Sequence, residues 1–161
     1  MARDPHSRNL RANRVIAPEI VYSVTTTVMH REPALGTITG RIVVASLEWL
    51  RSAGRIRLYG FVVMPDHVHA VLAPAASSLL PEVMKSLKGF SGKRIQAERG
   101  LHGALWQDGY FDHAIRTPSE AWAARKYIED NPVRAGLVGT PEAYRLSSAW
   151  PELRGMVDPI E

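Results

Sequence analysis

The fold of this chain is decided by its central stretch from Ile56 to Leu72, which reads IRLYGFVVMPDHVHAVL. Its first half is strongly apolar and is rich in β-branched and aromatic residues, which is typical of a strand. Pro65-Asp66 favours a tight turn, and the alternating run that begins at His67 predicts a second strand. The stretch is therefore predicted to form a β-hairpin with two histidines just after its turn.

The segments on both sides of the hairpin continue a mixed pattern. The predicted elements are a strand at 20–28, a helix at 37–53, the hairpin, a helix at 79–98, a strand within 105–115 and a helix from 117 to about 131. Gly89 and Gly92 leave a break possible in the second helix. The last helix has a sharp start, because Thr117 is a good N-cap and Glu120 completes a capping box. The order β-α-β-β-α-β-α favours the α+β class, with a ferredoxin-like antiparallel sheet and helices packed mainly on one face.

Composition limits the possible functions. The 161 residues suit one domain, with 20 Lys and Arg against 16 Asp and Glu and a formal net charge of +4. This excess permits a polyanionic partner but does not require one. The absence of cysteine excludes disulfides, thiolate catalysis and cysteine-based zinc sites. No apolar run is long enough for a membrane helix and no secretory signal is present, so we expect a cytoplasmic protein without membrane contact.

The chain is predicted to have three parts. Residues 1–18 form a basic N-terminal arm, residues 19–139 a folded domain and residues 140–161 a loop-rich tail. The arm contains four arginines without helical or strand periodicity. It is interpreted either as a flexible terminus or as an arm that lies along a phosphate backbone.

His67 and His69 form the most informative short motif. Residues two apart on a strand point to the same face, so the two imidazoles can converge on one metal ion while Val68 faces the core. Neutral imidazole is a common metal ligand. The motif alone is weak, because paired histidines on a strand are often polar surface groups or hydrogen-bonded core groups.

Tyr127 and Asn131 lie four residues apart on the last predicted helix and therefore share a face. An asparagine oxygen can be a third metal ligand beside two histidines, which would bring the tyrosine next to the metal. The spacing alone favours a plainer interpretation, in which Tyr127 packs against the sheet and Asn131 ends the helix before Pro132. The predicted buried stripe of this helix consists of Ala121, Ala124 and Ile128.

Two further segments combine basic and aromatic residues. The stretch from Trp106 to Arg116 could stack on bases and hold phosphates. In the plainer interpretation the aromatic side chains fill the core, and we favour it for Trp106 and Phe111. For His113 and Arg116 neither interpretation is favoured. The helix at 79–98 could line a phosphate groove or present an ordinary solvated face. Its basic residues are Lys85, Lys88, Lys93 and Arg94.

Three blocks in register give a specific resemblance. They are VVMPDHVHAVL at 62–72, LWQDGYFDHAIR at 105–116 and YIEDNPVRAGLV at 127–138. In order and spacing, from about residue 20 to residue 150, they resemble the single-tyrosine HUH transposases, and most closely the REP-associated tyrosine transposase group. The resemblance implies a ferredoxin-like core, a divalent metal, Mg²⁺ or Mn²⁺, and a covalent 5′-phosphotyrosine intermediate.

The resemblance also implies a role for each matching residue. His67 and His69 correspond to the histidine ligands, Asn131 to the helix-borne ligand and Tyr127 to the nucleophile. The helix-borne ligand is often Gln in insertion-sequence relatives, and Asn is similar to the REP-associated group. The expected DNA-binding residues are Lys85, Lys88, Lys93, Arg94, His113, Arg116 and Arg134.

The implied function is metal-dependent nicking and joining of single-stranded DNA beside a REP-like hairpin, by a monomer or a homodimer. Three alternatives stay open: a single-stranded DNA-binding protein of the same fold that does not cut, a metal phosphodiesterase that uses water, and a small metal-binding protein with structural histidines. Replacement of Tyr127 would separate the implied nicking and joining function from the phosphodiesterase, because only the tyrosine-dependent enzyme would lose its activity.

Overall fold

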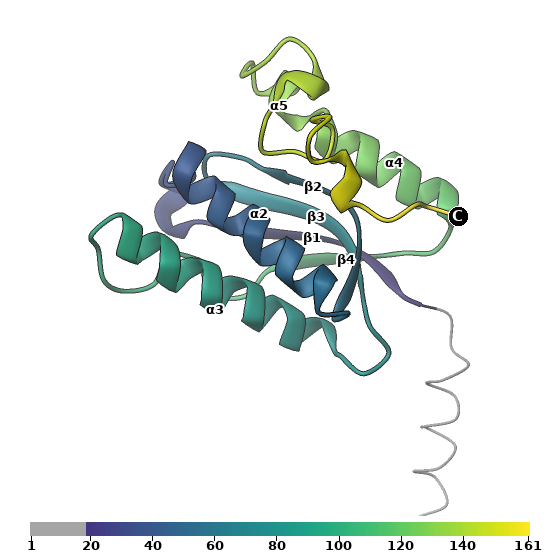
Figure 1. Cartoon of the computed structure of the whole chain (residues 1–161), viewed down its shortest axis with the longest axis horizontal. Coiled ribbons are helices and arrows are strands. Elements are labelled where there is room, and N and C mark those ends of the chain that lie inside the picture. The colour runs from purple at the N-terminus through teal and green to yellow at the C-terminus, as the bar shows by residue number, and fades with distance from the viewer. Residues whose placement is uncertain (1–18) are drawn as a thin grey trace, which may run out of the picture.

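The computed structural model describes residues 19–161, and the predicted N-terminal arm lies outside the described residues (Figure 1). One antiparallel sheet has the strand order β2-β3-β1-β4, the order of a ferredoxin-like fold. Its strands are β1 (Val21–Thr27), β2 (Ile56–Val63), β3 (His67–Pro74) and β4 (Phe111–Ile115). The helices are α2 (Thr37–Ser52), α3 (Leu80–Glu98), α4 (Pro118–Glu129) and the short α5 (Asn131–Arg134).

The central hairpin forms as predicted. β2 and β3 pair antiparallel with Val63 opposite Val68, and the amide of Met64 donates to the carbonyl of His67 at 2.8 Å across the turn. β3 also pairs with β1, which in turn pairs with β4. The hairpin therefore supplies one edge strand and one inner strand of the sheet, and the histidines begin the inner strand.

The two faces of the sheet carry separate hydrophobic clusters. α2 and α3 lie side by side on one face, whereas α4 packs on the other (Figure 1). Along β3, Val68 and Leu72 belong to the cluster under α2 and α3, and Val71 belongs to the cluster under α4. The predictions that Val68 faces the core and that most helices share one face are confirmed. Each such buried aliphatic side chain contributes about 1.5–3 kcal/mol to the hydrophobic stabilisation.

α3 continues through its two glycines without a break. Gly92 is buried, and a Cβ atom there would come within 3.2 Å of Trp106 Cδ1. The indole Nε1 of Trp106 donates a hydrogen bond to Ser91 Oγ at 3.1 Å. Gly92 therefore lets the indole ring pack closely against the helix, and the predicted core position of Trp106 is confirmed.

The predicted core position of Phe111 is wrong. Its side chain is 78% exposed, although it lies on a strand. β4 is an edge strand, and α4 packs on β2 and β3. No helix therefore covers the end of β4 where Phe111 lies, and only Ile115 at the other end of that strand is buried.

The C-terminal segment, residues 140–161, contains only two short 3₁₀ helices but packs along the outer edge of β2. The amide of Val63 donates to the carbonyl of Leu146, and the amide of Ser148 donates to the carbonyl of Phe61. Tyr144 Oη donates to the carbonyl of Val63 at 2.6 Å. The segment therefore satisfies backbone groups that an uncovered edge strand would expose.

Candidate active site around His67 and His69

His67 and His69 project from the start of β3 on the face that carries α4, opposite to Val68. Both side chains are half-buried, and their rings meet edge to face with centroids 4.6 Å apart and an interplanar angle of 78°. The period of two along the strand accounts for their common direction. The sequence prediction that the two imidazoles come together is therefore confirmed.

Each histidine is oriented through its Nδ1 atom. His67 Nδ1 lies 2.6 Å from Asp66 Oδ1, and His69 Nδ1 lies 2.7 Å from Thr25 Oγ1. Thr25 is directly opposite His69 in the register of β1 and β3. These hydrogen bonds occupy Nδ1 of both rings, so Nε2 is the atom that each ring can offer to another group.

Asn131 joins the histidines from the start of α5. Its Nδ2 atom lies 3.3 Å from His67 Nε2. The oxygen and nitrogen of an amide exchange places when the group rotates by half a turn, so the same position can present an oxygen ligand. Within residues 19–161 no group of three or more His, Cys, Asp or Glu side chains could hold a metal ion. A metal site here would therefore consist of two imidazoles and one amide.

Tyr127 is 63% exposed, so the plainer interpretation of the helical spacing, with Tyr127 packed against the sheet, is wrong. The buried stripe of α4 contains Ala121 and Ile128, as predicted, whereas the third predicted member, Ala124, is half-buried against the same cluster. The guanidinium of Arg134 lies 4.0 Å from the centre of the Tyr127 ring. This cation-π contact holds the ring at the end of α4 that leads into Asn131.

Arg134 also links the tyrosine to the histidines electrostatically. Burial, with smaller contributions from the neighbouring His67 and Arg134, lowers the pKa of His69 to about 4. His69 is therefore neutral at pH 7, which is the state in which imidazole binds a metal ion. Arg134 therefore contacts the ring of Tyr127 and also lies close enough to His69 to lower its pKa.

The four predicted DNA-binding residues on α3 fall into two groups. Lys85, Lys93 and Arg94 are exposed on α3. Lys88 is different, because its Nζ donates to the carbonyls of Gln107, at 2.7 Å, and Gly109. Burial lowers the pKa of Lys88. The ammonium group of Lys88 therefore fastens the loop before β4, a function that the sequence pattern did not suggest.

Phe111 and His113 lie on the same face of the sheet as the histidines. Thr25 stands opposite both His69 and Phe111, and Ser23 stands opposite His113. Both β4 side chains are exposed, as is Arg116 just beyond the strand. Adjacent strands are about 4.8 Å apart, so Phe111 is roughly 10 Å from His69 across the open half of this face.

Comparison with known proteins identifies the family of this chain. Residues 18–131 match the family of IS200-like transposases, and the chain belongs to that family. Over 75 residues it is 40% identical to the ISDra2 transposase TnpA of Deinococcus radiodurans, a match that covers 42% of this chain and 51% of the relative. The chain thus spans about half the length of that curated relative.

Two solved structures share the fold. A REP-associated tyrosine transposase bound to a REP hairpin superposes with a TM-score of 0.69 at 21% identity, covering 88% of this chain and 83% of that protein. A proposed transposase from Deinococcus radiodurans R1 gives a TM-score of 0.54 at 22% identity, covering 71% and 92%. The family resemblance and the α+β fold predicted from the sequence are confirmed.

No helix within residues 19–161 is long and apolar enough to cross a membrane.

Proposed function

We propose that this chain cuts and rejoins single-stranded DNA through a covalent bond between Tyr127 and a 5′-phosphate. The observation that carries the proposal is the geometry at the end of α4. There an exposed Tyr127 with Arg134 over its ring adjoins Asn131, whose amide lies 3.3 Å from His67 Nε2. Membership in the IS200-like transposase family supports the same chemistry.

The donor set fits a divalent cation. His67 and His69 would offer Nε2, because Asp66 and Thr25 engage Nδ1, and Asn131 would offer its amide oxygen. A set of two nitrogens and one oxygen suits Mn²⁺ at least as well as Mg²⁺, which prefers oxygen ligands. When bound, the cation would polarise the scissile phosphate and orient it for in-line attack.

The residues of the chain would carry the covalent step. Tyr127 Oη attacks phosphorus and forms a new P–O bond, its proton passes to solvent, and the bond from phosphorus to the 3′-oxygen breaks. The leaving 3′-oxygen takes up a proton and becomes a free 3′-hydroxyl. One P–O ester bond replaces another, so a second 3′-hydroxyl can reverse the step without a nucleotide cofactor. Arg134, in contact with the Tyr127 ring, would hold the phosphate by its positive charge.

The open half of the histidine-bearing face would guide the strand towards Tyr127. Phe111 is exposed and can stack on an unpaired base, and His113 and Arg116 follow along the same strand and its end. The REP-associated relative was solved with a REP hairpin, which supports a hairpin-bearing single strand as the substrate. Lys85, Lys93 and Arg94 on α3 would meet more distant parts of the DNA.

The test is a denaturing gel of the purified full chain with Mn²⁺ and a labelled single strand carrying a hairpin from its own genomic neighbourhood. We expect a slow protein–DNA band that disappears with a chelator and in Tyr127→Phe. Tyr22→Phe is the matched control, because Tyr22 packs against the cluster under α2 and α3 and should keep the band.

The other outcomes assign the alternatives. Free cleavage products without a covalent band would identify a phosphodiesterase that uses water. Tight binding without cleavage would identify a DNA-binding protein that does not cut. Indifference to DNA at low salt would leave a metal-binding protein with structural histidines.

A further inference from the structure

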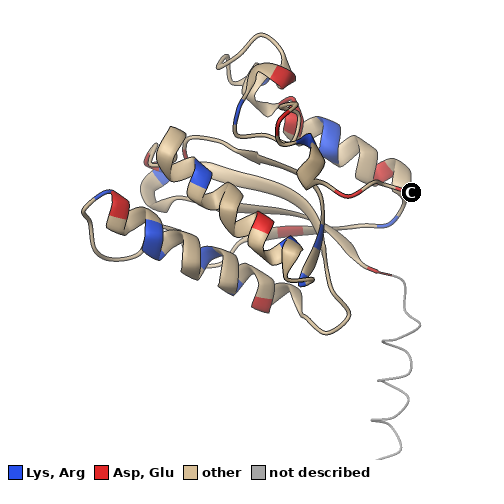
Figure 2. Ribbon diagram, viewed as in Figure 1, with Lys and Arg blue, Asp and Glu red and all other residues tan. Residues whose placement is uncertain are grey.

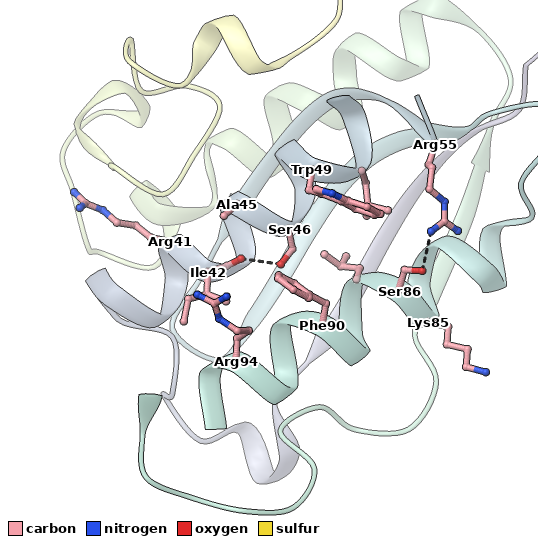
Figure 3. A pocket seen from close by; sticks show the side chains of 12 residues that line it. Arg41, Ile42, Ala45, Ser46, Trp49, Arg55, Lys85, Ser86, Phe90 and Arg94 are labelled. Carbon is pink, nitrogen blue, oxygen red and sulfur yellow. Dashed lines mark hydrogen bonds between the residues drawn. The ribbon is translucent and has the colours of Figure 1, made fainter. Parts of the chain in front are cut away.

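α2 and α3 leave a groove of about 910 Å³ on their outer surface, on the side of the molecule away from the histidines. Two aromatic rings stand in this groove, Trp49 from α2 and Phe90 from α3 (Figure 3). Trp49 is 58% exposed and Phe90 is 54% exposed. Aliphatic side chains, among them Ile42 and Leu87, line the space around the rings. Exposed apolar side chains gathered in a groove of this size are typical of a binding surface.

Four cations surround the rings. Arg41 and Arg94 lie at one end of the groove, and Arg55 and Lys85 lie at the other (Figure 3). Lys85 and Arg94 are nine residues apart on α3, which corresponds to about 13 Å along the helix. No carboxylate lines the groove, and within residues 19–161 none of the four cations forms a salt bridge. Basic segments also predominate along the middle of α3 in Figure 2.

We propose that this groove, which we call the α2–α3 groove, binds unpaired nucleotides of a nucleic-acid strand. Bases would stack on Trp49 and Phe90, and phosphates would meet the cations at the two ends. Two of the cations are held in place before binding. Arg55 donates to Ser86 Oγ at 3.1 Å, and the guanidinium of Arg94 lies 5.7 Å from the centre of the Phe90 ring. A single strand offers aromatic faces and regularly spaced negative charge together, which is the chemistry that these six side chains complement.

Charge disfavours the other possible occupants. A second copy docked groove to groove about a two-fold axis would bring the same cations together. Residues 1–18 contain four arginines and therefore have the same sign of charge as the groove. A protein helix would need both acidic and apolar side chains to fit this groove. A single strand of nucleic acid meets both requirements through its phosphates and its exposed bases.

The groove is distinct from the cutting site. Val68 points under α2 and α3, whereas His67 and His69 point to the opposite face. A strand in the groove is therefore not the strand at Tyr127, but an unpaired loop or flank of the same DNA. The identity of the nucleic acid as DNA rests on the proposed function; binding in the groove itself requires neither a metal nor Tyr127.

The experiment measures fluorescence anisotropy of labelled oligo-dT with the full chain carrying Tyr127→Phe, in EDTA at low salt. The test variant adds Trp49→Ala and Phe90→Ala, both more than half exposed, so folding should persist and is checked by circular dichroism. Trp122→Ala is the matched control, because Trp122 is 53% exposed on α4, on the opposite face. Stacking contributes about 1–3 kcal/mol per base, so each lost ring should weaken binding about 5- to 150-fold.

A second measurement tests the cations. Arg41→Gln with Arg94→Gln should make the slope of log affinity against log salt shallower by about 1.4, since each phosphate contact to a single strand contributes about 0.7. Iodouracil oligonucleotides should crosslink to Trp49 or Phe90 under light, as mapped by mass spectrometry.

Three results would overturn the proposal. One is equal affinity of the double aromatic variant and the Trp122→Ala control. Another is equal binding of a duplex of the same length. The third is self-association that is lost in the aromatic variant while DNA affinity stays unchanged. Failure of the groove is distinguishable from failure of the proposed function, because the covalent band of the otherwise unaltered protein is measured separately with Mn²⁺.

Discussion

Replacement of Glu129 by glutamine would remove one negative charge from the buried face of α4, the helix that carries Tyr127. Glu129 Oε1 accepts hydrogen bonds from Arg125 Nε at 3.1 Å and from Ser148 Oγ at 2.7 Å. Only 8% of the Arg125 side chain and 11% of the Glu129 side chain are exposed. Ser148 Oγ also lies 3.0 Å from the amide of Phe61 in β2, from which it accepts a hydrogen bond. The carboxylate therefore joins α4, the C-terminal segment and the sheet.

The size of the effect follows from what glutamine leaves behind. Loss of one partner of a buried ion pair costs about 3–5 kcal/mol, because the other charge is left uncompensated. Glutamine keeps the shape and one acceptor oxygen, so we expect the lower end, about 3 kcal/mol. With a urea m value near 2 kcal/mol/M, the unfolding midpoint should fall by about 1.5 M. The melting temperature should fall by about 6–12 °C for a chain of this length.

Urea unfolding of the full chain, followed by far-UV circular dichroism at pH 7, measures this change. Lys126→Gln is the control on the same helix, where an exposed Lys126 pairs with Asp130 at the same spacing and a distance of 2.9 Å. Exposed pairs contribute little, so its midpoint should stay close to that of the parent. Equal losses in Glu129→Gln and Lys126→Gln would refute the reasoning. The double variant Arg125→Met/Glu129→Leu should lose less than Glu129→Gln, because neither charge is then buried alone.

Three further predictions concern the site and its surroundings. Asp66→Asn should weaken Mn²⁺ binding about 10- to 100-fold in titration calorimetry, because Asp66 is the hydrogen-bond partner that orients His67. Unchanged affinity would contradict this role of Asp66. Phe111→Ala should reduce covalent-adduct formation at limiting DNA while the urea midpoint stays unchanged, since the ring is exposed; an unfolded variant would instead indicate a packing role. For Asp158, burial raises the pKa, but hydrogen bonds from Arg51 and the amide of Leu58 outweigh it and the net pKa is lowered. A carboxyl whose folded pKa is lowered stabilises the fold above its unfolded value, near pH 4, and loses that contribution as the pH falls through the folded value. Asp158→Asn should therefore lower the urea midpoint at pH 7 and have a smaller effect near pH 3. Equal effects at the two pH values would contradict this explanation.

The parts of the fold that were predictable from the sequence depend on contacts close along the chain. The hairpin from Ile56 to Leu72 has a short turn and a period of two, and both determine which side of β3 each residue takes. The capped start of α4 at Thr117 is local in the same sense, and Thr117 Oγ1 accepts from the amide of Glu120 as expected. Local rules were sufficient for these elements, because neighbours in sequence determine them.

The errors concern exposure, which depends on distant neighbours. Phe111 has the sequence signature of a core strand residue, but β4 is an edge strand and no helix covers it there. Tyr127 likewise has the spacing of a packed residue, yet its ring lies outside the stripe formed by Ala121 and Ile128. Thr25 is 44 positions from His69, so its hydrogen bond to the imidazole could be found only from the register of β1 with β3. The α2–α3 groove has the same origin, since Trp49 and Phe90 meet only when two helices pack.

The position of Tyr127 is determined largely by contacts outside the site. The ring of Tyr127 is 63% exposed, and the guanidinium of Arg134 lies over it. The helix below it is held by Ala121 and Ile128 in the cluster against the sheet and by Glu129 through Ser148 to β2. A shift of α4 away from the sheet would expose that cluster and separate a buried charge from its partners, and both changes are costly. The same rigid connection sets Asn131 against His67 at the start of α5, because only Asp130 separates Asn131 from the end of α4. The C-terminal segment, for which the sequence predicts loops, is thus one of the elements that hold α4 and the start of α5 in place on the sheet.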